Sequence, residues 1–202
     1  MPIPVLPLDP NAVRAHFPAF AEPGLAGQAF FENAGGSYTC RQVLDILDRF
    51  YRRTKVQPHA PYPAAAAAGA AMDRAYERLA EVFNVPVEAI HFGPSTSQNT
   101  YVLARAFARY LRPGAAIVVT NQDHEANTGA FRRLASEAFE LREWRIDRET
   151  GHLDLGDLDR LLDAKVGLVA FPHASNIVGE VNPVAEICSK VAEADAVSVV
   201  DG

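Results

Sequence analysis

Four segments of this 202-residue sequence place polar side chains directly after a short apolar run. They are GPSTS at 93–97, NQDHEAN at 121–127, PHASN at 172–176 and the final DG at 201–202. In an open α/β sheet the carboxyl ends of the strands meet at one edge, and ligands bind in the crevice outside that edge. We therefore expect these four segments to contribute to one ligand site.

The first segment has the features of an anion site at the start of a helix. Gly93 and Pro94 predict a tight turn, and Ser95 is a good N-cap for a helix that begins after it. The backbone N–H groups of Thr96 and Ser97 would then point outward at the positive end of the helix, which suits a phosphate. An ordinary serine N-cap explains the same residues, and the P-loop lysine and dinucleotide-binding glycines are missing, so both interpretations stay open.

The second segment places His124 at a strand-to-helix turn. If Asp123 or Asn121 caps the following helix, the imidazole is free to face a ligand. The alternative is a solvated histidine at a helix start. A metal site is not favoured, because His124 and His173 are the candidate ligands at this edge and no cysteine is near them.

The last two segments contribute Asn176 and Asp201. Asn176 can exchange a hydrogen bond with a ligand oxygen, or it can form a turn before Gly179. Asp201 follows a fully apolar strand, where a carboxylate is costly unless it meets Mg²⁺, a basic side chain or a protonated ring nitrogen. Pyridoxal 5′-phosphate (PLP) has a phosphate, an aromatic ring, a phenolic oxygen and a ring nitrogen, and so matches all four segments. A carboxylate against that nitrogen keeps it protonated, so that the ring can accept electrons from a carbanion.

The expected elements alternate regularly around these residues. Strands are expected at 89–92, 115–120, 139–146, 166–171 and 196–200, and helices at 95–110, 125–137, 155–162 and 184–194. This alternation predicts an α/β fold with a mostly parallel sheet flanked by helices. Upstream, helices are expected at 11–17, 39–54 and 64–83, with a proline-rich loop at 57–63 between the last two.

The composition indicates a soluble globular protein. Hydrophobic residues make up 49% of the chain and charged residues 22%, which is enough apolar material for a real core. The formal net charge of -6 argues against binding to nucleic acid or to an anionic membrane surface. The first residues lack the basic region of a signal peptide, and no apolar run is long enough to span a bilayer, so we expect a cytoplasmic location.

The order and spacing of the motifs resemble the N-terminal half of the class V aminotransferase family, specifically its cysteine desulfurase and selenocysteine lyase group of fold-type I PLP enzymes. The likeness runs from about Val13 to Gly202 and rests on FFENAGGS at 30–37, GPSTSQN at 93–99, QDHEAN at 122–127, PHASNIVGEVNP at 172–183 and VVDG at 199–202. It implies an N-terminal helix and loop at 1–28. Residues 29–202 would be the first part of the PLP-binding large domain, without its lysine segment and the C-terminal small domain.

The resemblance implies a role for each matching residue. Ser95 and Thr96 would hold the phosphate, and His124 would stack on the cofactor ring. Asn176 would bond the phenolic oxygen, and Asp201 the pyridine nitrogen. Residues near the amino-acid substrate would be Asn33, Ala34, Gly35 and His59. The sequence departs from the family pattern at Ser97-Gln98, where an acidic residue is frequent, and at His124-Glu125, where a histidine doublet is usual.

The resemblance also implies a homodimeric lyase that cleaves a C–S, C–Se or related bond at Cβ of an amino acid. The family's Schiff-base lysine lies downstream of the aspartate motif, and Lys55, Lys165 and Lys190 do not match it. We therefore expect this chain alone to be inactive. The alternative is a non-catalytic α/β fragment that binds only PLP or a phosphate.

Overall fold

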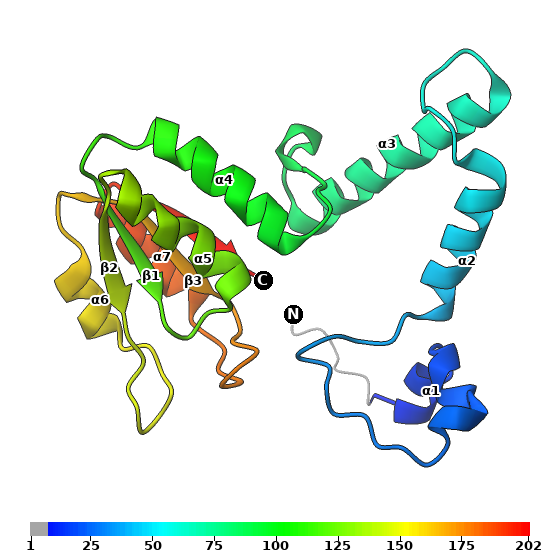
Figure 1. The fold of residues 1–202 in the computed structure, drawn as a ribbon, viewed down its shortest axis with the longest axis horizontal. Helices are drawn as coiled ribbons and strands as arrows, with labels where there is room; N and C mark the ends of the chain where they lie inside the picture. Colours follow the sequence, from blue (N-terminus) through cyan, green and yellow to red (C-terminus); the bar gives the residue numbers. More distant parts are fainter. Residues whose placement is uncertain (1–7) are drawn as a thin grey trace, which may run out of the picture. The chain divides into compact units, whose positions relative to one another are not determined.

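The computed structural model describes residues 8–202, and the chain divides into two compact units at Phe92 and Gly93 (Figure 1). The second unit carries the sheet. Its elements are α4 (Thr96–Tyr110), β1 (Ala116–Thr120), α5 (Glu125–Arg133), the 3-10 turn η5 (Leu134–Glu137), β2 (Glu140–Trp144), α6 (Leu155–Leu161), β3 (Val166–Pro172), α7 (Val184–Glu193) and β4 (Val197–Asp201).

The four strands form one parallel sheet in the order β2-β1-β3-β4. This confirms the predicted α/β fold with a parallel sheet flanked by helices. β1 is central and all five of its residues are buried, as expected for an apolar strand covered on both faces. β4 pairs with β3 along its whole length, from Leu168 opposite Val197 to Pro172 opposite Asp201.

Two apolar clusters fill the space on either face of the sheet. Ile117 and Val119 of β1 pack with Ala104 of α4 and Phe131 of α5 on one face. Val118, which points the other way, belongs to a second cluster with residues of α6 and α7, among them Leu158 and Ile187. Side chains alternate along a strand, so a single apolar strand supplies both clusters.

The direction of the helices follows from this layering. α4 ends shortly before β1 begins, and α5 starts shortly after β1 ends, and both pack on the same face of the sheet. Each of these helices therefore runs opposite to the strands, as βα units require. The N-termini of α4 and α5 consequently lie at the carboxyl edge of the sheet (Figure 1).

The first unit is helical in its described part. It contains α1 (Pro10–Arg14), η1 (Pro18–Ala21), η2 (Pro23–Leu25), α2 (Arg41–Arg49), the π-helical turn η3 (Phe50–Thr54), α3 (Pro63–Phe83) and the 3-10 turn η4 (Val87–Ala89). The long helix predicted at 64–83 is confirmed as α3, which ends where Asn84 adopts a left-handed conformation with φ of 52°. None of the described helices is long and apolar enough to cross a membrane.

The strand predicted at 89–92 is wrong. Residues 87–89 form η4 instead, and 90–92 belong to no strand. A strand is stabilised by its hydrogen-bonded neighbours, and no strand in the part of the chain that the structure describes pairs with this run. The other boundaries shift by a few residues: α1 ends at Arg14, and the N-cap position of α2 is Cys40, without a side-chain hydrogen bond, rather than the predicted Thr39.

Candidate active site

The residues predicted from the four motifs lie at the carboxyl edge of the sheet in the second unit. Ser95 precedes α4 and His124 precedes α5, while Asp201 is the last residue of β4. Val199 packs into the cluster beneath α4 and α5. Because side chains two apart on a strand share a face, Asp201 points to the same side of the sheet. The two helix N-termini and the Asp201 carboxylate thus share one edge and one face.

Ser95 is the N-cap of α4, as predicted. Its Oγ accepts a hydrogen bond from Gln98 N at 3.2 Å, and its carbonyl oxygen accepts one from Asn99 N at 2.9 Å. The N–H groups of Thr96 and Ser97 come before the first intrahelical bond and therefore point out of the helix. The serine hydroxyl also keeps its proton for donation. The capping role is thus compatible with binding an anion at the same turn.

His124 caps α5 with its own ring. Nδ1 accepts a hydrogen bond from Ala126 N at 3.0 Å. The prediction that Asp123 or Asn121 would be the cap is wrong: Asp123 bonds His124 N, and Asn121 Oδ1 accepts from Ile146 N at 2.9 Å. Because Nδ1 is an acceptor, the neutral ring carries its proton on Nε2. The ring is exposed, and the cap restricts its orientation.

Asp123, which the sequence suggested only as a helix cap, is a buried carboxylate at the candidate site. Its side chain is 7% exposed. It accepts hydrogen bonds from His124 N at 2.7 Å and from Asn127 Nδ2. Burial raises the pKa of Asp123 to about 6, the two hydrogen bonds oppose this, and the negative charge of Asp201 raises it further. The candidate site thus contains two carboxylates that interact electrostatically.

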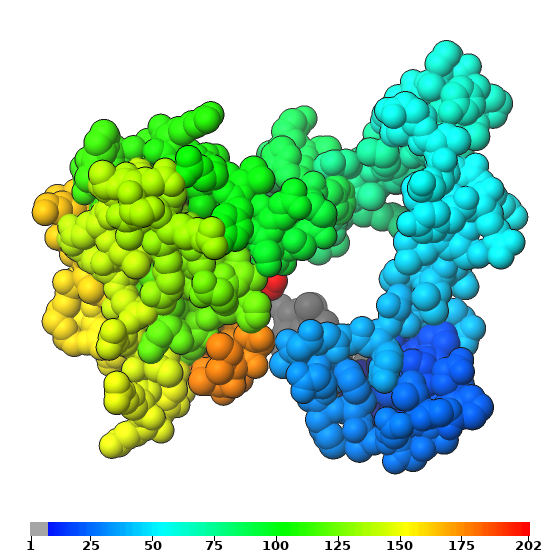
Figure 2. Space-filling view, viewed as in Figure 1, coloured from blue at the N-terminus to red at the C-terminus, as the bar shows by residue number. Residues whose placement is uncertain are grey.

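Asn176 lies on a loop that leaves β3 and folds back on itself. Ala174 and Val181 form an antiparallel bridge across this loop. The turn at its tip is made by Ser175, whose Oγ accepts from Ile177 N at 3.2 Å and from Val178 N at 3.3 Å. Asn176 itself is exposed, and the loop projects from the surface of the second unit, in orange in Figure 2. The turn interpretation therefore applies to Ser175, and the Asn176 amide remains accessible to a ligand.

Asp201 is half-buried at the end of β4. Its carbonyl oxygen accepts a hydrogen bond from His173 N at 2.7 Å, which continues the β3–β4 pairing to the edge of the sheet. Within residues 8–202, no basic side chain forms an ion pair with its carboxylate. A partly desolvated carboxylate without a cation is costly, so this position suits a ligand that carries a positive charge or an N–H donor.

The residues predicted to lie near the substrate belong to the first unit. Asn33, Ala34 and Gly35 lie together in a turn. His59 has a left-handed backbone with φ of 61°, and its ring packs so closely on α3 that a Cβ at Gly69 would lie 2.5 Å from Nδ1. The proximity of these residues to the substrate stays a prediction.

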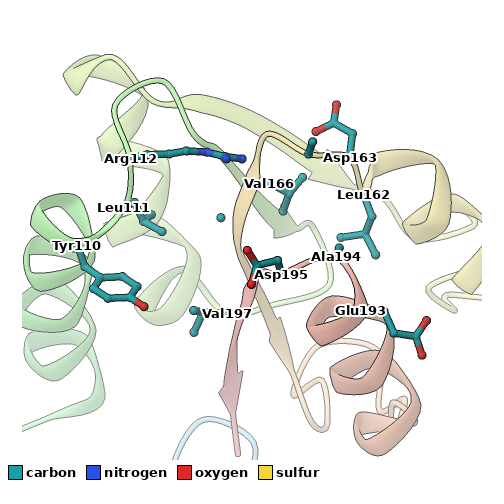
Figure 3. A pocket seen from close by; sticks show the side chains of 12 residues that line it. Tyr110, Leu111, Arg112, Leu162, Asp163, Val166, Glu193, Ala194, Asp195 and Val197 are labelled. Carbon is teal, nitrogen blue, oxygen red and sulfur yellow. The ribbon is translucent and has the colours of Figure 1, made fainter.

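A further concavity of about 720 Å³ lies at the opposite, amino-terminal end of the strands (Figure 3). Its charged side chains include Arg112, Asp163 and Asp195. None of the predicted site residues lines it. The candidate site is therefore distinct from this concavity.

The lysines of the second unit lie away from the carboxyl edge. Lys165 directly precedes β3 and so lies at the amino end of that strand. Lys190 lies on α7, where its Nζ is 2.8 Å from Asp159 Oδ1 of α6. Neither amine can reach a ligand beside Asp201 from these positions.

The donor set at the carboxyl edge fits PLP. Two outward N–H groups and a serine hydroxyl suit the phosphate, and an exposed imidazole can stack on a ring. The accessible Asn176 amide suits the phenolic oxygen, and the Asp201 carboxylate suits a protonated ring nitrogen.

Comparisons with known proteins identify the family. The family model "Aminotransferase class-V" matches residues 29–202. A cysteine desulfurase from Serratia proteamaculans is 33% identical over 196 residues, which cover 94% of this chain and 48% of that protein. "Aminotransferase-like protein FGM3" from Gibberella zeae is 34% identical over 197 residues, with the same coverage of 94% and 48%. The chain thus spans about half the length of the curated relatives it matches.

Among solved structures, the apo cysteine desulfurase from Thermococcus onnurineus NA1 superimposes with a TM-score of 0.86 at 25% identity, covering 96% of this chain and 47% of that one. The sheet therefore belongs to the fold-type I PLP enzymes, and the family depends on PLP in general. The family match, the parallel sheet and the shared fold together show that this chain belongs to the class-V aminotransferase family.

Proposed function

We propose that the protein is the N-terminal portion of a PLP-dependent lyase similar to the cysteine desulfurases, and that the carboxyl edge of its sheet binds the cofactor. The observation that carries this proposal is the convergence of the α4 N-terminus, the His124 ring and the Asp201 carboxylate on one face of one edge. Each group by itself has an ordinary structural explanation. PLP accounts for all three together, because it has a phosphate, an aromatic ring and a ring nitrogen.

Each residue has a distinct task in this proposal. The N–H groups of Thr96 and Ser97 and the hydroxyl of Ser95 bind the phosphate, with the helix dipole in support. The His124 ring, oriented by its bond to Ala126 N, packs against the face of the cofactor ring. Asn176 bonds the phenolic oxygen.

Asp201 holds a proton at the pyridine nitrogen through a charge-assisted hydrogen bond. When bound, PLP supplies an electron sink for a carbanion at Cα of an amino acid. Asp201 supports that chemistry by keeping the ring nitrogen positively charged.

The substrate in this proposal is a cysteine-like amino acid that is cleaved at Cβ. The support is that relatives from Serratia, Pectobacterium and Haloferax are named cysteine desulfurases. The whole enzyme requires an amine to bind the cofactor. Lys165 and Lys190 lie away from the edge, and Lys55 does not match the family's lysine. We therefore propose that the 202-residue chain has no turnover of its own.

The protein is also proposed to be a cytoplasmic homodimer. One face of α2 supports pairing with a second copy, because its apolar side chains are 43–54% exposed: Val43, Leu44, Ile46 and Leu47. A cluster of exposed apolar side chains is typical of a protein–protein contact. The cytoplasmic location rests on the sequence alone.

A titration of the protein with PLP, followed by absorbance and fluorescence, tests the cofactor site. Asp201→Asn removes the charge next to the ring nitrogen, and a charge-assisted hydrogen bond contributes about 1.5–3 kcal/mol, so we expect Kd to rise roughly 10- to 100-fold. Asp195→Asn is the matched control, because Asp195 lies before β4 at the other end of the sheet. Equal affinities for PLP in both variants would reject the site.

Two further measurements separate the proposed lyase from its alternative. Alanine formation from cysteine by the full-length, PLP-loaded protein, with sulfide released by an added thiol reductant, tests the reaction. A chain that binds inorganic phosphate as tightly as PLP would instead be a phosphate-binding α/β fragment.

A further inference from the structure

Gln122 is a buried amide next to the candidate site. Its side chain is 1% exposed, and it lies two residues before His124. Its Nε2 donates to the carbonyl oxygen of Gly151 at 2.9 Å, and its Oε1 accepts from Asn182 Nδ2 at 2.7 Å. Its own carbonyl oxygen accepts from Ser175 Oγ at 2.7 Å. This one residue therefore connects the His124 segment to both ends of the Asn176 loop.

The Asn182 end of the loop is held rigidly. Asn182 Nδ2 donates to Gln122 Oε1 and also to the carbonyl oxygen of Pro172 at 2.7 Å. Its backbone N–H donates to the carbonyl oxygen of His173 at 2.8 Å. The Asn182 side chain is 5% exposed, so both amide protons are used inside the protein. The base of the loop is thus fixed to the end of β3 and to Gln122.

The Ser175 end of the loop is held by the same residue. Ser175 is 5% exposed, donates its hydroxyl proton to Gln122 and accepts two backbone N–H groups from Ile177 and Val178. Asn176 follows Ser175 directly and is exposed. The backbone next to Asn176 is therefore held by a hydroxyl that is anchored to the backbone carbonyl of Gln122, while the Gln122 side chain holds the Asn182 end of the loop.

We propose that Gln122 is a positioning residue that sets the spacing between the His124 ring and the Asn176 amide. The inference rests on the proposed function, because it assumes that these two side chains hold one cofactor. A buried amide costs free energy unless all its partners are present, and a satisfied network rigidifies the groups that it joins. Two of the three partners of Gln122, Ser175 and Asn182, lie at the ends of the loop that carries Asn176, so the network holds that loop against the His124 segment.

A double-mutant cycle between Gln122→Met and Asn176→Ala tests this role. Methionine keeps the length of the side chain and removes both of its hydrogen bonds. Asn176→Ala should raise the Kd for PLP about 10-fold, the size of one hydrogen bond. If Gln122 acts through Asn176, Gln122→Met raises the Kd for PLP by a similar factor. The double variant then also binds PLP only about 10-fold more weakly than wild type. If the double variant bound PLP about 100-fold more weakly, which is the product of the single effects, the two residues would act independently and the proposal would be overturned.

Inorganic phosphate provides a readout that loss of structure would affect and loss of positioning would not. Phosphate uses the α4 N-terminus alone, so its Kd should be unchanged in Gln122→Met. If that variant does not fold, Ser175→Ala can be used instead, because it breaks the hydroxyl bond to the Gln122 backbone carbonyl. It should raise the Kd for PLP and leave the Kd for phosphate unchanged. Wild-type protein that fails to bind PLP rejects the proposed function. If wild type binds PLP and both Gln122→Met and Ser175→Ala bind it with the same affinity, only the role of Gln122 is rejected.

Discussion

The imidazole of His124 caps the helix that follows it, with Nδ1 accepting the N–H of Ala126 at 3.0 Å. One side chain thus stabilises α5 and presents an exposed ring at the carboxyl edge of the sheet. The two tasks use different atoms: capping needs the lone pair on Nδ1, whereas stacking needs the ring face. They can therefore be separated by substitution.

We expect His124→Asn and His124→Ala to differ in stability and agree in cofactor binding. Asparagine is a good N-cap, so the free energy of unfolding of His124→Asn should lie within about 0.5 kcal/mol of wild type. That of His124→Ala should be about 1 kcal/mol lower. Both variants lack the ring, so both should bind PLP about 10-fold more weakly. Urea unfolding and PLP titration measure the two effects. Wild-type PLP affinity in His124→Asn would show that the ring does not contact the cofactor.

Asp123 should make stability depend on pH in an unusual direction. Burial raises its pKa from the ordinary value of 3.8 to about 6, so between these values the native state binds a proton that the unfolded state releases. Below pH 4 Asp123 is protonated in both states and does not lower the stability of the protein. As the pH rises through 6, the buried carboxylate becomes charged and the free energy of unfolding falls. Two pKa units correspond to about 3 kcal/mol at most.

Asp123→Asn removes this titration. The difference in unfolding free energy between the variant and wild type should therefore shift in favour of the variant by up to about 3 kcal/mol between pH 4 and pH 7.5. Urea unfolding at a series of pH values measures this difference, and other titrating groups cancel in it. A difference that stays constant with pH would contradict the raised pKa.

Ser95→Asp should keep the helix and weaken the phosphate site. Aspartate caps a helix as well as serine does and interacts favourably with its dipole, so stability should stay within about 0.5 kcal/mol. Its negative charge opposes a phosphate at the same turn, so we expect both PLP and inorganic phosphate to bind at least 10-fold more weakly. Ser95→Ala is the control: it loses the cap but keeps the N–H groups of Thr96 and Ser97. Unchanged phosphate affinity in Ser95→Asp would place the anion elsewhere.

Neither Lys165 nor Lys190 should form an imine with bound PLP. Lys165 precedes β3 at the far end of the strand, and Lys190 pairs with Asp159. Borohydride reduction followed by peptide mass spectrometry should find no stoichiometric pyridoxyl group on either residue. The Lys165→Gln and Lys190→Gln variants should bind PLP as wild type does. Specific labelling of either lysine would contradict the position of the site.

Thr120→Val should stabilise the protein. Thr120 is 0% exposed at the end of β1, and its Oγ1 has no hydrogen-bond partner among the described residues. Valine has the same shape without the unpaired hydroxyl, so the free energy of unfolding should rise by about 1 kcal/mol. Thr100→Val is the matched control, because the Thr100 hydroxyl donates to the carbonyl oxygen of Thr96 at 2.8 Å. Thr100→Val should not raise the free energy of unfolding. An increase in both variants would point to a general effect of the added methyl group.

The sheet was predictable because its signal is local. The apolar runs before Asn121, His173 and Asp201 alternate with helix-length segments, and the structure has β1, β3 and β4 at these runs. The run at 89–92 carries the same local signal and forms no strand in the described part of the chain. Strand formation needs a neighbour, and periodicity reports only the segment itself.

The candidate site was only partly predictable. Ser95 could be identified because an N-cap is a short-range feature of the chain. Gln122 and Asn182 could not, because they are 60 positions apart and their hydrogen bond exists only once β1 and β3 are paired. Asp123 shows the same limit, since its raised pKa depends on burial and on the charge of Asp201.

The sequence by itself determined the alternation of strands and helices, the serine cap of α4 and the polar residues at the strand ends. These follow from preferences that act within a few residues. Only the tertiary structure decided that His124 caps its own helix, that Ser175 rather than Asn176 makes the loop turn, and that one buried glutamine joins both segments. The reason is that a buried polar group takes whichever partner the packed chain brings within hydrogen-bond distance, and that choice depends on contacts between residues far apart in the sequence.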